Sequence, residues 1–134
     1  MTTLLAHITV KSGTEATWED LCRKLHAETH SSESDVLRYE YWRGKDPQTY
    51  YCLLSFADHR AWIDHQASDH HEADAVARRE CLDSIRLEFV DPVGGASDLP
   101  PTEQQDAPDG ASELVAKYTE RFQAQIADWW LALR

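Results

Sequence analysis

Four segments of the chain have the hydrophobic pattern of β-strands. They are residues 4–10, 36–43, 49–56 and 84–90. Every second residue from Leu4 to Val10 is apolar, and the last segment alternates in the same way. The two middle segments are rich in aromatic and β-branched residues and flank a Gly-Lys-Asp-Pro turn, so we expect them to pair as a hairpin.

The segments between these strands follow the helical period instead. In the first of them the apolar positions recur at helical spacing at Trp18, Leu21, Cys22, Leu25 and Thr29. After the third strand, Asp58 is placed to cap a helix through Gln66, and Ser68 to cap another that runs to about Glu80. The order strand, helix, strand, strand, helix, strand predicts a ferredoxin-like α+β fold, with an antiparallel sheet and helices on one face.

The pattern changes after residue 92, so we divide the chain into a domain of residues 1–92 and an extension of residues 93–134. Residues 93–111 contain several Gly and Pro and have no periodicity, which indicates a linker. Residues 112–133 then carry an apolar stripe at helical spacing that ends at Trp129 and Trp130, which predicts one amphipathic helix. This stripe would be buried on the chain's own sheet or on a partner subunit.

Composition excludes several classes of partner. The formal net charge of −11 leaves no basic patch for nucleic acid or for an anionic membrane surface. No apolar run approaches the roughly 20 residues that span a bilayer, and the N-terminus has the pattern of a strand instead of a signal peptide. The three widely spaced cysteines, Cys22, Cys52 and Cys81, fit reduced thiols, so we expect a cytoplasmic protein.

The candidate chemistry lies in residues 56–74, where Trp62, His65, His70 and His71 gather around a junction of two helices. His65 is one helical turn from Trp62 on the expected inner face, which makes it the best candidate base; the alternative is a buried histidine bonded to a backbone carbonyl. His70 and His71 fall in the first turn after Ser68, where the helix dipole disfavours their charged forms. His70 would line a pocket mouth or serve as a surface or capping residue.

A metal site is the other hypothesis for the histidines. His26 and His30 stand four residues apart, with Cys22 one turn earlier, and Glu33 would add a carboxylate. No third ligand is tied to this helix face by spacing, and two ligands rarely hold a structural zinc. We therefore predict no metal site and no cofactor, while the sequence leaves open whether His26 and His30 bind an ion.

Three segments of the chain resemble the antibiotic biosynthesis monooxygenase family. They are residues 7–25, with a Lys-x-Gly turn; the hairpin of residues 35–58, which ends in Phe-Ala-Asp; and residues 65–71, which read His-x-x-Ser-x-His-His. The last motif is similar to the quinol-monooxygenase-like branch. The resemblance covers roughly Leu4 to Asp91.

The resemblance implies a homodimer in which two sheets face each other as a dimeric α+β barrel. It also implies a monooxygenase that oxidises a small aromatic or quinol compound with dioxygen, without metal or flavin. In this interpretation His65 and His70 are catalytic, because they help to bind and deprotonate the substrate. The substrate pocket is expected to be lined by Trp62, Trp42, Trp18 and His71, although a tryptophan at helical spacing is also a common core residue.

Two alternatives remain open from the sequence. One is a binding or regulatory dimer of the same fold without enzymatic activity. The other is haem binding or degradation, although Ala6, His65 and Ala75 occupy the positions where the haem-degrading branch has Asn, Trp and His. Leu54 also stands at a strand position that is often acidic in relatives.

Overall fold

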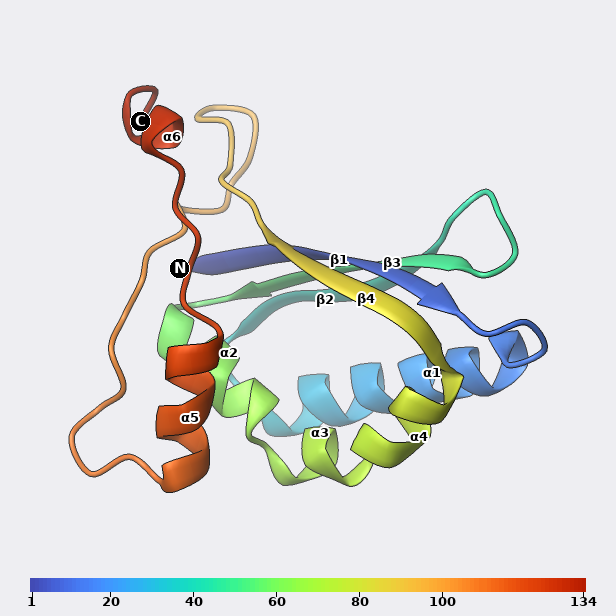
Figure 1. The fold of residues 1–134 in the computed structure, drawn as a ribbon. Coiled ribbons are helices and arrows are strands. Elements are labelled where there is room, and N and C mark those ends of the chain that lie inside the picture. The colour runs from blue at the N-terminus through green and yellow to red at the C-terminus, as the bar shows by residue number, and fades with distance from the viewer.

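The computed structural model describes all 134 residues and is built around a four-stranded sheet with one layer of helices (Figure 1). The strands are β1 (Thr2–Val10), β2 (Val36–Arg43), β3 (Thr49–Phe56) and β4 (Leu82–Phe89). The helices are α1 (Glu15–Ser32), α2 (His59–Gln66), α3 (Asp69–Ala73), α4 (Ala75–Cys81), α5 (Glu113–Arg121) and α6 (Asp128–Leu131). No helix is long and apolar enough to cross a membrane.

The sheet has the order β2-β3-β1-β4, and all of its strand pairs are antiparallel. Helices α1 to α4 cover one face, while the other face of the strands carries no helix layer (Figure 1). This arrangement confirms the ferredoxin-like α+β fold expected from the order of elements. The observed β2 and β3 have the predicted bounds, and β1 begins two residues earlier than expected.

The core lies between the sheet and the helices, because alternate strand residues point to opposite faces. Leu4, Ala6, Ile8 and Val10 of β1 are buried there, together with Trp18 and Leu25 of α1 and Trp62 of α2. Burial of a whole Val, Leu or Ile side chain stabilises the fold by roughly 1.5–3 kcal/mol. The helices are thereby fixed against the sheet, which gives the space between them a defined shape.

The helix expected to run from Ser68 to about Glu80 is divided into α3 and α4 at Asp74. Ser68 is the N-cap, as predicted, since its hydroxyl accepts from the His71 backbone N–H at 3.4 Å. Asp74 is buried, and the Lys24 ammonium donates to both of its carboxylate oxygens at 2.7 and 2.9 Å. This ion pair joins residues that are far apart in the sequence. No local sequence pattern predicts the break at Asp74.

The C-terminal helix is shorter than predicted, because α5 ends at Arg121 and only the short α6 follows. Hydrogen bonds to the rest of the chain replace the helical ones after Arg121. The Phe122 carbonyl accepts from His59 Nε2 at 3.0 Å, and the Ala124 N–H donates to Gln104 Oε1 at 2.6 Å. The prediction of a continuous helix through residue 133 is therefore wrong. Helix α5 packs against α2 of its own chain.

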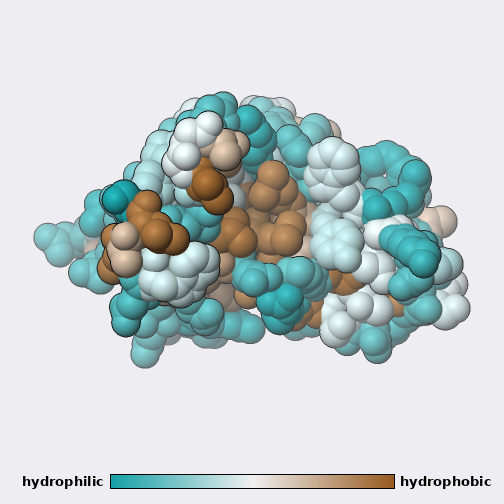
Figure 2. Space-filling view, turned by 90° about the horizontal axis from the view of Figure 1, so that it is seen from above, coloured by the Kyte–Doolittle hydropathy of each residue, from teal (hydrophilic) through white to brown (hydrophobic).

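The open face of the sheet has an apolar centre and a charged edge. Leu5 and Leu53 are register partners on this face. Nearby, His7 Nε2 lies 2.8 Å from Glu88, and Arg86 lies 3.1 Å from the same carboxylate. Figure 2 looks onto this side and shows a brown, apolar area surrounded by hydrophilic surface.

Candidate functional site

A cavity of about 400 Å³ lies between the sheet and the helix layer. Its floor is made by inward-facing residues of the strands, and helices α1 to α4 with α5 provide the rest of the wall. Its volume falls at the lower end of the range for small-molecule sites. The sheet positions include Ala6 and Cys52, whose small side chains leave room above the strands.

One wall of the cavity is aromatic. Trp18 of α1 meets Tyr41 of β2 edge to face at 6.2 Å between ring centroids, and Tyr39 meets Tyr41 at 5.5 Å. The two tyrosine hydroxyls are hydrogen-bonded to each other at 3.0 Å. Burial raises the pKa of both phenols well above the usual value, so they remain neutral. This wall can therefore stack with an aromatic ring without carrying charge.

His71 of α3 lies on the wall of the cavity and is held neutral. Burial, followed by the charge of Arg78, lowers the pKa of His71 from 6.5 to about 2. Both close contacts of the ring are made by Nδ1, which lies 3.1 Å from the Gln66 carbonyl oxygen and 3.3 Å from Arg78 Nη2. One nitrogen cannot both donate to the carbonyl and accept from the guanidinium, and we assign the proton to Nδ1, which then donates to Gln66 at the shorter distance. Nε2 is thus the ring nitrogen without a protein partner, and it is available to a ligand.

Three arginines and one carboxylate also line the cavity. Arg78 and Arg79 come from α4, Arg121 comes from α5, and Glu72 comes from α3. The Tyr118 hydroxyl of α5 donates to Glu72 Oε1 at 2.7 Å. The cavity therefore combines an aromatic wall with a cationic one.

The extension closes one side of this cavity. Tyr118, Arg121 and Phe122 are lining residues, and the Phe122 ring packs edge to face on Trp62 at 5.4 Å. Because α5 is anchored both by this contact and by the bond from Tyr118 to Glu72, it is part of the site in this chain. Trp62 itself is fully buried behind Phe122 and is not a lining residue.

The other two histidines of the motif form a cluster with Glu33 behind the cavity. His65 Nδ1 and His70 Nε2 each lie 2.8 Å from Glu33 Oε1, so one carboxylate can accept from both rings. The His65 ring is buried and lies 4.9 Å from both Tyr39 and His71, measured between centroids. Neither His65 nor His70 lines the cavity. His65 contacts two residues that do, Tyr39 and His71, and Glu33 joins His70 to it.

Glu33, His65 and His70 are also the group whose ligand atoms lie close enough to hold a metal ion. A metal on Nδ1 of His65 would place the ring proton on Nε2, which is buried without an acceptor. Metal-bound histidines normally donate that proton to a second partner. A hydrogen-bonded cluster therefore fits these residues better than a metal centre. The rings of His26 and His30 on α1 are 4.4 Å apart between centroids and tilted by 55°, and neither residue belongs to this group.

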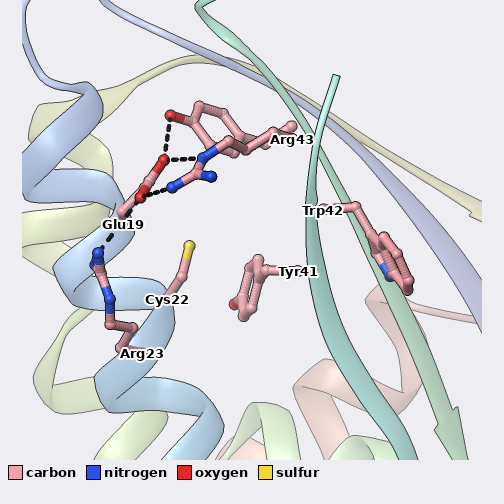
Figure 3. A pocket seen from close by; sticks show the side chains of 7 residues that line it. Glu19, Cys22, Arg23, Tyr41, Trp42 and Arg43 are labelled. Atoms are coloured by element: carbon pink, nitrogen blue, oxygen red, sulfur yellow. Dashed lines mark hydrogen bonds and ion pairs between the residues drawn. The ribbon is translucent and has the colours of Figure 1, made fainter. Parts of the chain in front are cut away.

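The tryptophans expected in the pocket lie in three different places. Trp18 lines the cavity, Trp62 lies in the core, and Trp42 is 58% exposed. Tyr41 takes the inward position of β2, so its neighbour Trp42 points to the other face of the sheet. Figure 3 shows Tyr41 and Trp42 turned in different directions from the same strand.

Figure 3 also shows a second pocket of about 330 Å³ between α1 and the ends of β2 and β3. Two hydrogen bonds from Arg43, at 2.6 and 2.7 Å, lower the pKa of Glu19 to about 2. Burial raises the pKa of Cys22 to about 12, so this thiol is not an active nucleophile. The charged groups here are paired with each other, and we place the functional site in the larger cavity.

Several site residues were missed from the sequence. Tyr39 and Tyr41 are the inward residues of a strand that was itself predicted correctly, so the alternation would have identified them. Arg78 is brought to the cavity by α4, and its spacing along the chain gives no sign of it. Tyr118 falls on the apolar stripe of the extension, but the spacing does not show which surface that stripe covers. Glu33 was considered only as a partner for His26 and His30.

The fold and the cavity define the protein as a ferredoxin-like α+β protein with a cavity between the sheet and the helices. The family model for antibiotic biosynthesis monooxygenases matches residues 1–75, which is more than half of the chain. The chain belongs to this family. No curated protein matches it significantly.

Solved structures have the same fold. A protein from Caulobacter crescentus CB15 that is assigned to the antibiotic biosynthesis monooxygenases is 23% identical, with a TM-score of 0.65, over 69% of this chain and 89% of its own. One from Bacteroides thetaiotaomicron, assigned likewise, is 16% identical, with a TM-score of 0.66, over 78% and 95%. A Mycobacterium tuberculosis protein is 15% identical, with a TM-score of 0.64, over 72% and 98%. Family membership supports a monooxygenase-like function in general.

Proposed function

We propose that the protein is a monooxygenase that oxidises a small aromatic or quinol compound with dioxygen and needs no metal or flavin. The observation that carries the proposal is the cavity, in which the neutral His71 faces the same space as the aromatic wall of Trp18, Tyr39 and Tyr41. Family membership supports the type of reaction, and the cavity volume supports a small substrate.

The chemistry requires a substrate that becomes an electron-rich anion. His71 Nε2 accepts the proton of a substrate hydroxyl, and the resulting phenolate raises the pKa of the ring again, because an adjacent negative charge favours the imidazolium. The anion gives an electron to dioxygen, and a carbon–oxygen bond then forms between the two. For 1,4-dihydroxynaphthalene the balance is one quinol and one dioxygen to one 2-hydroxy-1,4-naphthoquinone and one water.

In this proposal His65 and His70 act indirectly, because they do not line the cavity. Their shared acceptor, Glu33, fixes His65 with Nδ1 protonated and places its ring against His71 and Tyr39. We propose that His65 and His70 position His71, which touches the substrate. Their replacement should then lower the rate less than replacement of His71.

The open face of the sheet supports a homodimer as the working form. Its centre is apolar at Leu5 and Leu53, and its edge has charges of both signs at Arg86 and Glu88. A second copy that faces it with the same surface would meet both features, as an isologous interface requires.

Dioxygen uptake tests the proposal directly. Protein treated with a chelator is mixed with 1,4-dihydroxynaphthalene, and uptake is compared with the protein-free rate. We expect wild-type uptake above that rate, a loss of roughly 100-fold in His71→Ala, and a smaller loss in His65→Ala. Wild-type uptake at the protein-free rate, or uptake that His71→Ala leaves unchanged, would refute the mechanism.

A second candidate is a small-molecule-binding protein of the same fold without turnover. The pKa of His71 favours it, because a ring that titrates at about 2 is a weak proton acceptor while the cavity is empty. This candidate predicts that an aromatic ligand raises the melting temperature and is recovered unchanged. Product analysis of the same samples separates the two functions.

A further inference from the structure

The cavity collects positive charge in a protein that is strongly acidic. The chain has 24 acidic and 13 basic residues, yet three arginines line the cavity and Glu72 is its one lining carboxylate. The arginines that form ion pairs with carboxylates are all elsewhere, at Arg23, Arg38, Arg43, Arg86 and Arg134. Arg78, Arg79 and Arg121 are thus the cavity's unpaired cations.

Arg78 has the most unusual environment of the three. Its Nη1 is buried and has no hydrogen-bond partner, while Nη2 lies 3.3 Å from His71 Nδ1. A buried donor on a charged group is costly when it lacks an acceptor, and native proteins leave few such groups. The missing acceptor would be supplied by a ligand in the cavity that Arg78 lines.

The one carboxylate that lines the cavity, Glu72, is engaged by another group. Glu72 accepts from the Tyr118 hydroxyl at 2.7 Å and forms no ion pair with Arg78. Tyr118 of α5 therefore engages the cavity's one carboxylate, Glu72 of α3. The guanidinium of Arg78 is left for a ligand. Arg121, from the same helix, lies with its charge 5.1 Å from the centre of the Phe122 ring.

We infer that the cavity binds its aromatic ligand as a carboxylate, with the ligand's carboxylate on Arg78 and its ring against the wall of Trp18, Tyr39 and Tyr41. This inference rests on the cavity of the proposed function and names the class of its substrate. A guanidinium offers parallel N–H groups that match the two oxygens of a carboxylate, which a neutral phenol cannot use. Arg79 and Arg121 add positive potential in the same cavity.

The residues that carry this preference lie outside the part of the chain that defines the family. The family model matches residues 1–75, whereas Arg78 and Arg79 belong to α4 and Arg121 belongs to the extension. The extension thus contributes to ligand selection as well as to the closure of the cavity.

Two air-stable probes that differ by one carboxylate test the inference. The affinities of the full-length protein for 1-hydroxy-2-naphthoate and for 1-naphthol are measured by calorimetry at 50 mM salt. We expect the naphthoate to bind roughly 10- to 100-fold more tightly, which is the range for a charge-assisted hydrogen bond. Its affinity should fall as salt is raised, and that of 1-naphthol should not.

Single substitutions test which residue causes the preference for the naphthoate. Arg78→Gln should bind the naphthoate at least 10-fold more weakly and keep its affinity for 1-naphthol, which also shows that the cavity has stayed folded. Arg121→Gln should give a smaller loss. Lys45→Gln is the matched control, because it removes the same charge from the exposed turn between β2 and β3 and should change neither affinity.

The outcomes separate this inference from the oxygenase proposal. Equal affinity for the two probes, or an Arg78→Gln variant that keeps the naphthoate preference, overturns the carboxylate site and leaves the oxygenase proposal standing. Binding of neither probe also overturns it. A naphthoate preference that depends on Arg78, in a protein that consumes no dioxygen with any quinol, supports the carboxylate site and refutes the oxygenase.

Discussion

His71 links the stability of the protein to pH at the scale of a single residue. Its pKa is about 2 in the folded protein and about 6.5 in the unfolded chain. Above pH 6.5 the ring is neutral in both states and has no effect. As pH falls from 6.5 towards 2, the unfolded state takes up a proton that the folded state does not, so the free energy of unfolding decreases by up to about 1.4 kcal/mol per pH unit.

The His71→Gln variant lacks this proton uptake. We therefore expect it to lose less stability than the wild type between pH 7 and pH 5, as measured by denaturant unfolding at each pH. The two proteins differ only at this residue, so the difference between the two curves isolates His71. Parallel curves would show that folding does not lower the pKa of His71, so that its ring takes up a proton in the folded protein as well.

Individual site residues were partly predictable from the sequence. Trp18 and His71 were expected at the pocket, and both line the cavity. Trp42 could have been placed on the other face, because it is out of phase with Tyr39 and Tyr41 in a strand of correctly predicted bounds. The pairing of Glu33 with His65 could not, since it joins the end of α1 to α2 across 32 residues.

Ser68 is the residue that starts α3, and its effect belongs to the scale of the element. Its hydroxyl caps the helix at the His71 N–H and also donates to the His65 carbonyl at 2.8 Å. We expect Ser68→Ala to lower the free energy of unfolding by about 1 kcal/mol. Ser31→Ala, on exposed α1, is the control and should have little effect. Equal stability of the two variants would contradict the capping role.

Helix α5 is held to the cavity by the bond from Tyr118 to Glu72. Tyr118→Phe removes this bond and frees Glu72 to compete for Arg78. We expect a several-fold weaker affinity for 1-hydroxy-2-naphthoate, an unchanged affinity for 1-naphthol and a loss of stability of about 1 kcal/mol. Thr119→Val provides a control on the same helix, because its hydroxyl bonds only within α5. If Tyr118→Phe keeps the preference for 1-hydroxy-2-naphthoate over 1-naphthol, Glu72 does not compete for Arg78.

The elements differ in how far local sequence determined them. Strands β2 and β3 and the caps Asp58 and Ser68 follow from local patterns, and the structure agrees with them. The ends of α3 and α5 depend on distant partners instead. Lys24 reaches Asp74, and Gln104 takes the N–H of Ala124, so the helical period alone predicted longer helices.

At the scale of the whole molecule, the open face predicts the state of assembly. We expect the wild type to be a dimer by light scattering and Leu53→Asp to be a monomer, because the substitution puts a charge at the apolar centre of the interface. Val76→Asp is the control, since Val76 is 59% exposed on α4 and lies away from the open face. A wild-type monomer, or a Leu53→Asp dimer, would contradict the barrel arrangement.

The central claim is that one oxygen atom of dioxygen enters the product without a metal. Metal-free protein is incubated with 1,4-dihydroxynaphthalene under ¹⁸O₂, and the product is analysed by mass spectrometry. The account predicts 2-hydroxy-1,4-naphthoquinone with one ¹⁸O atom, formed roughly 100-fold faster by the wild type than by His71→Ala. Unlabelled 1,4-naphthoquinone as the sole product, formed at the protein-free rate, would contradict it.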